Sequence, residues 1–212
     1  KPHFYFLRVF NIRVMIDEDL LKHAGAKEIL IEKNEVLFRQ GESARYYYQI
    51  INGAVKMNNF NDDGKEFIQG IFADANSFGE PPLLINDNYP ANAVALTQTT
   101  LLQLAKEKFL DLLIQNPIIH LAITTTLAKR LYFKTIMASE ISSQDPEHRI
   151  LKLIDYFKLK IDRVPKELAY KVDITRQQIA YLTGLRVETV IRAIKSLEKK
   201  GEINIKNHKV FR

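Results

Sequence analysis

Apolar and polar residues follow two different patterns along the chain, and the change comes near residue 105. From about Lys27 to Leu104 the apolar residues cluster or alternate in short runs, as in ILIEKNEVLF and YYYQIINGAVK. Turn residues separate these runs, and Asp63-Gly64 between two of them is a strong signal for a β-hairpin. Many short strands with turns at this spacing are typical of a sandwich or barrel.

From Lys106 onward the pattern has a helical period. Residues 106–115 predict a short helix, and Pro117 is well placed to open a second one that continues to about Ser143. Along this second helix a stripe recurs at close to coiled-coil spacing. Its members are Ile123, Leu127, Leu131, Lys134 and Ala138. Such a stripe packs either on its own domain or on a second copy of the chain, and we expect the second copy.

Asp145-Pro146 ends the long helix and marks a domain boundary. A short helix is expected over 147–160, and a weak strand pattern follows in KELAYKVDI. Thr175 and Gln178 then have the spacing of a capping box, which starts a helix that stops at Gly184. The next helix covers about 186–200, and INIKNHKVFR predicts a small hairpin. Helix, glycine turn, helix and hairpin are the elements of a winged helix-turn-helix.

The composition excludes several kinds of site. With 212 residues, 46% of them hydrophobic and 26% charged, the chain has room for one large or two small globular domains. The absence of cysteine excludes disulfides, thiolate zinc sites and cysteine-held iron–sulfur clusters. No apolar run approaches the roughly 18 residues of a membrane span, and no signal peptide is visible, so we expect a cytoplasmic protein. The sequence begins at Lys1 and not Met, and it leaves open whether residues are missing before Lys1.

The net charge of +6 is distributed unevenly between the two ends. Residues 146–212 carry 16 Lys and Arg against 8 Asp and Glu, whereas residues 1–145 carry 15 against 17. A basic end joined to a nearly neutral remainder indicates a polyanionic partner for that end. Glu188 and Arg192 in the last predicted helix are four residues apart and share one face. They either form a solvated ion pair or meet base edges in a DNA groove, and the first does not exclude the second.

The order of the motifs resembles that of the Crp-Fnr superfamily of bacterial transcription regulators. The resemblance covers nearly the whole chain and rests on LFRQGE, YYQIINGAVK, FGE, Asn116-Pro117 and, most specifically, TRQQIAYLTGLRVETVIRAIKSLEKKGEI. It implies an α+β fold with an N-terminal β-roll of the cyclic-nucleotide-binding jelly-roll type, a long dimerisation helix and a C-terminal winged helix-turn-helix. We expect these parts at 1–115, 116–145 and 146–212. A homodimer that binds double-stranded DNA is implied, and an activator of this type would also contact RNA polymerase.

The resemblance assigns Glu188 and Arg192 to base reading. An arginine pairs with guanine O6 and N7, and a carboxylate accepts a hydrogen bond from cytosine N4. Val187 replaces an arginine of the cyclic AMP receptor protein, so that Val-Glu-Thr is more similar to the fumarate-nitrate regulator branch, whose half-sites resemble TTGA. Ile191 either contacts a thymine methyl group or packs inside. We expect a TTGA-like or TGA-containing half-site, repeated with two-fold symmetry about one helical turn away.

Phosphate contacts are implied for a further set of residues, which supply the cations and donors that fix the register on DNA. By resemblance these are Arg176, Gln177, Thr189 and Lys195. Arg186 stands where the family often has a capping Ser or Thr. Because arginine cannot cap in that way, we expect Arg186 near a phosphate.

The effector pocket departs from the family pattern. Gly79 and Glu80 match the Gly-Glu pair whose acid holds a ribose hydroxyl, but Pro90 and Ala91 stand where cyclic-nucleotide binders have Arg and Ser or Thr. A buried phosphate without its cation costs several kcal/mol, so cyclic AMP is not expected. Pro81-Pro82 also removes two backbone donors.

The identity of an effector is left open by the remaining residues. Lys134 and Thr135 fall where the family's effector touches both subunits, and Lys134 either binds an anion or extends into solvent, which we expect. The histidines are scattered without metal-ligand spacing, so no metal is expected, and haem ligation by a histidine or the N-terminal segment is a minor alternative. An unidentified anion, an apolar molecule or no effector at all fits the sequence.

The residues argue against two other classes of function. An enzyme is not expected, because no nucleophile–base pair, phosphate-cradling loop or cupin-like cluster of ligands occurs in the sequence. The alternative is a signalling module that binds a small molecule and acts on protein partners. The missing phosphate arginine and the winged helix-turn-helix pattern argue against it.

Overall fold

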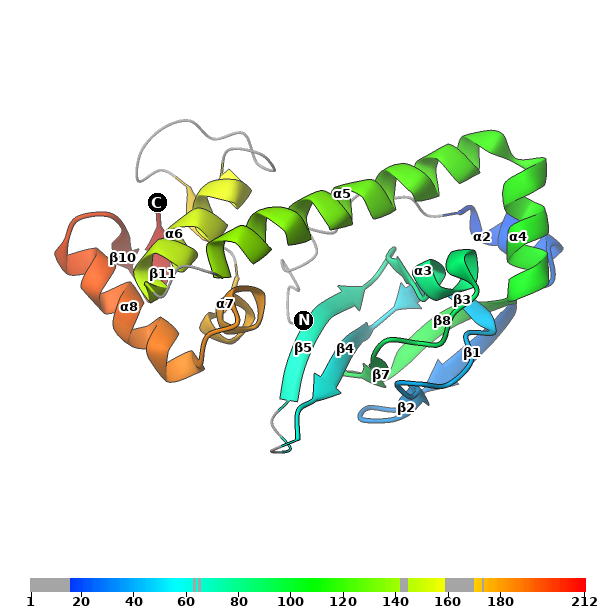
Figure 1. Ribbon diagram of the computed structural model, residues 1–212, viewed down its shortest axis with the longest axis horizontal. Coiled ribbons are helices and arrows are strands. Elements are labelled where there is room, and N and C mark those ends of the chain that lie inside the picture. Colours follow the sequence, from blue (N-terminus) through cyan, green and yellow to red (C-terminus); the bar gives the residue numbers. More distant parts are fainter. Residues whose placement is uncertain (1–15, 63, 65, 142–144, 159–169, 173) are drawn as a thin grey trace. The chain divides into compact units, whose positions relative to one another are not determined.

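The computed structural model describes residues 16–62, 64, 66–141, 145–158, 170–172 and 174–212 (Figure 1). Its described residues form two compact units, from Ile16 to Arg130 and from Leu131 to Arg212. The division falls inside a long helix, α5 (Pro117–Ile141), which contributes its first part to one unit and its second part to the other. Within these ranges no helix combines the length and apolar character that crossing a bilayer requires.

The first unit is a β-roll of two four-stranded antiparallel sheets, as expected from the short alternating runs. One sheet has the order β1 (Lys27–Ile31), β8 (Thr99–Ala105), β3 (Tyr46–Asn52) and β6 (Ser77–Phe78). The other has the order β2 (Val36–Phe38), β7 (Asn92–Ala95), β4 (Ala54–Phe60) and β5 (Glu66–Ala73). Strands β4 and β5 pair in the register that places Phe60 opposite Glu66, which confirms the hairpin predicted around Asp63-Gly64.

Several aromatic side chains lie in the interior of the roll. The rings of Phe38 and Tyr89 stack with centroids 3.7 Å apart, and those of Tyr48 and Phe78 lie 5.3 Å apart. The ring centroid of Phe72 lies 5.7 Å from that of Phe78. Aromatic pairs at these separations add to the stabilisation from burial alone. Aromatic rings thus pack against one another inside the roll.

In the part of the chain that the structure describes, three helices flank the roll in addition to α5. They are α2 (Glu18–His23), α3 (Glu80–Ile85) and α4 (Lys106–Gln115), the last with the bounds that the sequence predicted. Helix α4 is fixed by Phe109, whose ring stacks on Tyr47 with centroids 4.5 Å apart. Asp17 caps α2 by accepting a hydrogen bond from the backbone N–H of Leu20.

Two residues of the stripe predicted to meet a second copy, Ile123 and Leu127, pack against the core of their own unit. Ile123 is 1% exposed, and Leu127 is partly buried against the core of its own unit. The large apolar side chains that α5 exposes, in the part that the structure describes, are Ile118, Leu121, Leu131 and Tyr132. Ala138 is exposed as well. The helical period was therefore correct, but the side of α5 that covers the roll is set by contacts with distant residues.

The second unit contains the predicted helix-turn-helix and wing. Its helices after α5 are α6 (Pro146–Tyr156), α7 (Arg176–Thr183) and α8 (Val187–Lys199). A three-stranded antiparallel sheet follows the order β10 (Asn204–Lys206), β11 (Lys209–Phe211) and β9 (Lys171–Val172). Phe133 of α5 belongs to this unit and its ring lies 5.1 Å from that of Tyr156. Residues 157 and 158 continue from α6 in a π-helical turn, and the rest of the helix expected up to residue 160 falls outside the described residues.

Helix α7 begins with the predicted capping box. The Thr175 hydroxyl accepts from the backbone N–H of Gln178 at 3.2 Å, and the Gln178 side chain accepts from the Thr175 N–H at 2.7 Å. Thr175→Ala is expected to lower the free energy of unfolding of the second unit by about 0.5–2 kcal/mol, because an N–H at the helix start loses its partner. Urea unfolding followed by circular dichroism measures this loss. Gln177→Ala, at an exposed position of the same turn, serves as the control and should have little effect; equal losses would contradict the capping role.

Candidate functional site

Helix α8 is positioned by a short turn and by its own buried stripe. Gly184 ends α7 with φ +67°, and the Leu185 N–H donates to the Ala180 carbonyl at 3.0 Å. The stripe predicted to face inward is confirmed, since its four residues are at most 7% exposed. These residues are Val190, Ala193, Ile194 and Leu197. Burial of this stripe forces the opposite face of α8 toward solvent.

The outward face of α8 carries the residues predicted to read bases. Glu188 and Arg192 are both exposed, and no ion pair joins them in the described part of the chain. The structure therefore does not contain the intrahelical ion pair that was one of the two alternatives for these residues. Ile191 is 39% exposed, and Val187 is half-buried at the start of the helix. The face combines a carboxylate, a guanidinium and an apolar side chain, which are the groups that base edges in the major groove can match.

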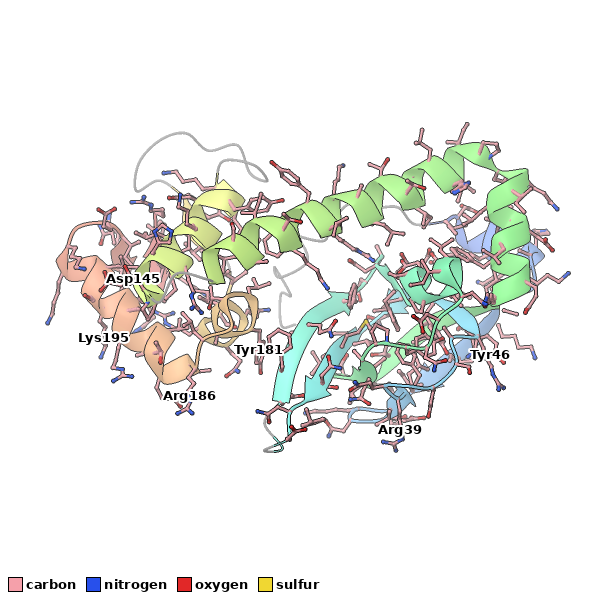
Figure 2. All side chains as sticks on the ribbon, viewed as in Figure 1. Arg39, Tyr46, Asp145, Tyr181, Arg186 and Lys195 are labelled. Carbon is pink, nitrogen blue, oxygen red and sulfur yellow. The ribbon has the colours of Figure 1, made fainter. Side chains whose placement is uncertain are left out.

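Four of the five predicted phosphate contacts, all except Lys195, lie around the helix starts. Gln177 is exposed in the first turn of α7, and Thr189 is half-buried in the first turn of α8. Arg186 and Lys195 are exposed, and Figure 2 shows Arg186 at the beginning of α8 with Lys195 further along it. Arg186 is the N-cap residue and makes no side-chain cap, as expected. Arg176 differs from the others, because its Nη1 donates to the His208 carbonyl of the wing at 3.4 Å.

The wing adds residues that the sequence analysis did not assign. Asn207 and His208 form its tight turn with φ values of +47° and +61°. Lys206 and Lys209 flank the turn and are exposed, so the wing presents cations to solvent. Two lysines beside an Asn-His turn in the basic end of the chain were the signal that could have identified them.

Partly exposed ion pairs hold the wing to the helices. Arg212 Nε lies 2.9 Å from Asp155 Oδ1 on α6, and its Nη1 lies 2.8 Å from Glu202 Oε2. The hydrogen bonds from Arg212 to Asp155 and the negative charge of Asp155 raise the pKa of Arg212, although its partial burial acts in the opposite direction. At the end of α8, Lys200 Nζ lies 2.6 Å from Glu147 Oε2 on α6. These contacts join α6 to the end of α8 and to the wing.

The Gly-Glu pair of the first unit lies at a buried polar cluster. Gly79 has φ +87° and a Cβ at this position would lie 3.3 Å from the Tyr46 carbonyl oxygen, which explains the glycine. Glu80 is 1% exposed, and its carboxylate accepts from the Ser77 hydroxyl. Arg130 of α5, which the sequence analysis missed, places Nη1 3.5 Å from Glu80 Oε2. Burial, followed by the nearby Glu80 charge, raises the pKa of the Tyr47 hydroxyl, so this group stays protonated.

The segment that aligns with the phosphate-binding pair offers no cation. Ala91 is fully buried, and the Pro90 carbonyl accepts from Asn59 Nδ2 at 2.7 Å. Lys134 and Thr135, the other predicted pocket residues, are exposed on α5 beyond Arg130. Thr135 donates its hydroxyl to the Leu131 carbonyl at 3.0 Å. Gly79, Glu80, Pro90 and Ala91 therefore lie in one unit, and none of these four residues supplies a cation.

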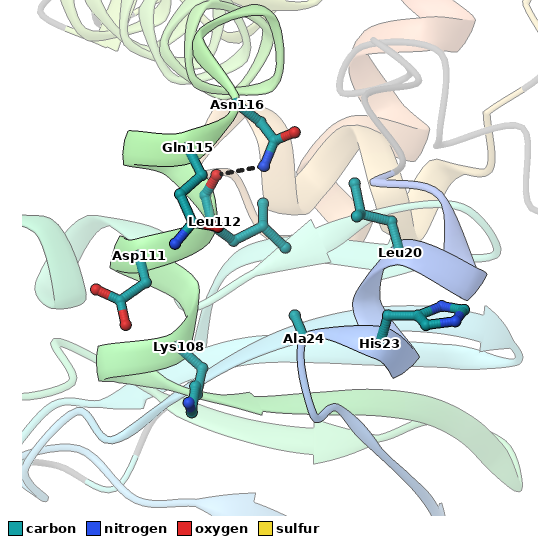
Figure 3. Close-up of a pocket in the computed structure, with 8 residues that line it drawn as sticks. All are labelled: Leu20, His23, Ala24, Lys108, Asp111, Leu112, Gln115 and Asn116. Atoms are coloured by element: carbon teal, nitrogen blue, oxygen red, sulfur yellow. Dashed lines mark hydrogen bonds between the residues drawn. The ribbon is translucent and has the colours of Figure 1, made fainter.

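A cavity of about 320 Å³ opens elsewhere on the first unit, between α2 and α4 (Figure 3). Leu20, Ala24 and Leu112 form its apolar part, and polar side chains of both helices surround them. None of the predicted effector residues lines it. Among the residues that the structure describes, no cluster of three or more His, Asp and Glu is arranged to bind a metal ion.

Two sequence families match the chain, one in each unit. The cyclic nucleotide-binding domain family matches residues 28–116, and the Crp-like helix-turn-helix domain family matches residues 148–211. The chain belongs to the Crp-Fnr superfamily. Its membership confirms the resemblance read from the sequence, including the order of β-roll, long helix and helix-turn-helix.

Relatives of this Crp-Fnr protein are transcription regulators. It is 29% identical over 174 residues to the cAMP-activated global transcriptional regulator CRP of Haemophilus influenzae, covering 79% of this chain and 75% of the relative. It is 27% identical over 176 residues to the cyclic AMP receptor protein of Thermus thermophilus, covering 83% and 79%. The chain is accordingly a DNA-binding transcription regulator of the Crp type.

Solved structures agree with this fold. The c-di-GMP responsive global regulator CLP of Xanthomonas campestris superposes with a TM-score of 0.67 at 25% identity, covering 92% of this chain and 98% of that structure. CprK complexed with OCPA superposes with a TM-score of 0.72 at 17% identity, covering 92% and 91%, which shows the shared fold alone. The named ligands of these proteins differ, so membership does not by itself identify an effector.

Proposed function

We propose that this Crp-Fnr regulator binds DNA as a homodimer on a TTGA-like or TGA-containing inverted repeat and is not activated by cyclic AMP. The observation that carries the proposal is the outward face of α8, where Glu188 and Arg192 are exposed and not paired with each other. Arg192 would pair with guanine, and Glu188 would accept from cytosine N4. Arg176, Gln177, Arg186, Thr189 and Lys195 would contact phosphates and fix the register.

The wing lysines and the basic charge of the second unit support a DNA partner. Each cation that neutralises a phosphate releases a counterion, so operator affinity should fall steeply with salt concentration. The exposed apolar side chains of α5, from Ile118 to Tyr132, support pairing with a second copy, because exposed apolar patches on a helix mark interaction surfaces. A two-fold dimer then reads a two-fold site.

The rejection of cyclic AMP is supported by Ala91 and Pro90. A phosphate buried beside a methyl group and an already bound carbonyl oxygen would have no cation, at a cost of several kcal/mol. Operator affinity measured with and without cyclic AMP tests this rejection, and a binding-site selection from random DNA tests the proposed DNA site. Enrichment of an inverted repeat that contains TGA supports it, and enriched sequences without two-fold symmetry would contradict it.

Arg192→Ala is expected to weaken operator binding by about 1–3 kcal/mol and to relax discrimination at one base pair of each half-site. The cause is loss of the bidentate contact to guanine. Fluorescence anisotropy with the selected operator and single-base variants measures both effects. Lys195→Ala is the matched control, because loss of a phosphate contact weakens all sequences alike and lowers the salt slope by about 1. Equal losses for Arg192→Ala on operator and random DNA would contradict its assignment.

A further inference from the structure

The cavity between α2 and α4 is lined by one side of each helix (Figure 3). Leu20, His23 and Ala24 line it from α2 and its C-cap, and Lys108, Asp111 and Leu112 line it from α4. In each set the second and third residues come three and four positions after the first, which places them on one helical face. The volume, about 320 Å³, is near the lower limit for ligand sites, which span about 300–1,000 Å³. The cavity therefore suits one small molecule.

Both walls of the cavity are fixed to the same strand, β3. The fully buried Gln49 holds the chain just before α2, because its Nε2 donates to the Ile16 carbonyl at 2.8 Å and its Oε1 accepts from the Ile16 N–H at 3.1 Å. The Tyr47 hydroxyl donates to the same Gln49 Oε1 at 2.9 Å. The Tyr47 ring stacks on Phe109 of α4. A ligand would therefore meet a site that the fold has already formed.

The base of the cavity is apolar. Leu112 is 4% exposed, and Leu20 and Ala24 are half-buried against the core of the unit. An aliphatic group that covers these side chains removes further apolar surface from water. His23 is already bonded within its own helix, since its Nδ1 lies 2.6 Å from the Asp19 carbonyl oxygen, and we assign it no ligand contact. The base therefore favours an aliphatic side chain.

The rim of the cavity carries one charge of each sign. Lys108 and Asp111 are exposed, and in the residues that the structure describes no ion pair includes either of them. Exposed side chains change rotamer within nanoseconds, so both charged groups can turn toward a ligand. A simple anion would be repelled by Asp111, and a simple cation by Lys108. The rim therefore favours a molecule that carries both an ammonium and a carboxylate group.

We propose that this cavity binds a free aliphatic amino acid of about the size of leucine. Its side chain lies on Leu20, Ala24 and Leu112, its carboxylate faces Lys108 and its ammonium group faces Asp111. Because the rim is exposed, these ion pairs contribute little, and the dissociation constant is expected in the millimolar range. The site belongs to the first unit, so the proposal is independent of the proposed DNA site.

Titration of isotope-labelled protein with L-leucine, followed by NMR chemical shifts, tests the proposal. Saturating shifts are expected at Leu20, Ala24 and Leu112. Isocaproate lacks the ammonium group of leucine and isoamylamine lacks its carboxylate, so each should bind about 2- to 5-fold more weakly. Shifts that do not saturate, or that occur away from the cavity, would overturn the proposal. Equal binding of leucine and either analogue would refute the assignment of a zwitterion.

Variants of the rim show whether each charge meets the group assigned to it. Lys108→Met and Asp111→Asn should each weaken leucine binding about 2- to 5-fold. In Lys108→Met, leucine and isoamylamine should bind equally, because the ligand carboxylate has lost its partner. Glu107→Gln is the matched control for Asp111→Asn, since Glu107 is exposed on α4 but does not line the cavity. Its affinity should be that of the wild type, and an equal loss in this control would contradict the assignment.

A variant of the base tests the cavity itself. Ala24→Leu places a larger side chain where the ligand side chain would lie, so the saturating shifts should disappear. Circular dichroism shows whether this variant is folded. A folded Ala24→Leu protein that binds leucine like the wild type would overturn the proposal. If the variant does not fold, the comparison of leucine and isoamylamine on Lys108→Met decides, because Lys108 is exposed and its substitution leaves the core intact.

Discussion

Leu121→Glu is expected to convert the protein to a monomer and to remove tight operator binding. Leu121 is 68% exposed on α5, and Ile118, three residues earlier, is 85% exposed. Positions 118, 121, 125, 128 and 132 follow the alternating three- and four-residue spacing of a coiled-coil seam. In a symmetric dimer each substitution occurs twice, so two carboxylates would be buried without cations, at a cost of several kcal/mol each.

The consequence for DNA binding follows from the two half-sites. Specific binding typically exceeds non-specific binding by about 4–10 kcal/mol, and a monomer that reads one half-site keeps about half of this advantage. The expected loss for Leu121→Glu is therefore about 2–5 kcal/mol of operator binding free energy. Light scattering after size-exclusion chromatography reports the mass of the variant, and fluorescence anisotropy reports its affinity.

Leu30→Glu is the matched control for this experiment. Leu30 is a leucine on β1 of the same unit with a similar exposed fraction, 59%, but it is not on α5. The control should remain a dimer with wild-type affinity. A Leu121→Glu protein that remains a dimer would show that the exposed face of α5 is not the dimer interface.

Gly53→Ala is expected to cause the largest loss of stability among the single substitutions considered. Gly53 lies between β3 and β4 with φ +108°, and an added Cβ would lie 2.5 Å from Thr99 Oγ1 and 2.7 Å from the Gln98 carbonyl oxygen. Thr99 cannot retreat easily, because it is fully buried and bonds to Ala54 through its hydroxyl. Backbone strain of about 1–3 kcal/mol and overpacking of about 1–3 kcal/mol together predict a loss of about 2–6 kcal/mol.

Gly25→Ala separates the two causes. Gly25 has a similar φ of +99°, but a Cβ there would meet nothing within 4 Å. Only the strain of about 1–3 kcal/mol is then expected. Thermal unfolding monitored by circular dichroism should rank wild type above Gly25→Ala and Gly25→Ala above Gly53→Ala. Equal melting temperatures for the two variants would show that the predicted clash is relieved by a shift of the strands.

Much of the fold and of the DNA-facing site was readable from the sequence because the relevant patterns are local. A capping box needs only residues 175 and 178, and the burial of α8 needs only its own period, so both were predicted correctly. The members of each pair, Val190 with Ile194 and Glu188 with Arg192, lie about one helix turn apart and share a face. The two pairs are offset by two residues, or about half a turn. When the first pair faces the core, the second must therefore face outward. The sequence by itself therefore determined the order of the elements, the family and the exposed face of the recognition helix.

The tertiary structure alone decided which side of α5 covers the roll and what fills the effector region. Ile123 follows the helical period as well as Leu121 does, and only packing against the roll buries the first and exposes the second. Glu80 and Arg130 are 50 residues apart, so no local pattern links them. Contacts between distant segments depend on how strands and helices pack together. A periodic pattern shows which side of an element is apolar but not which segment packs against that side.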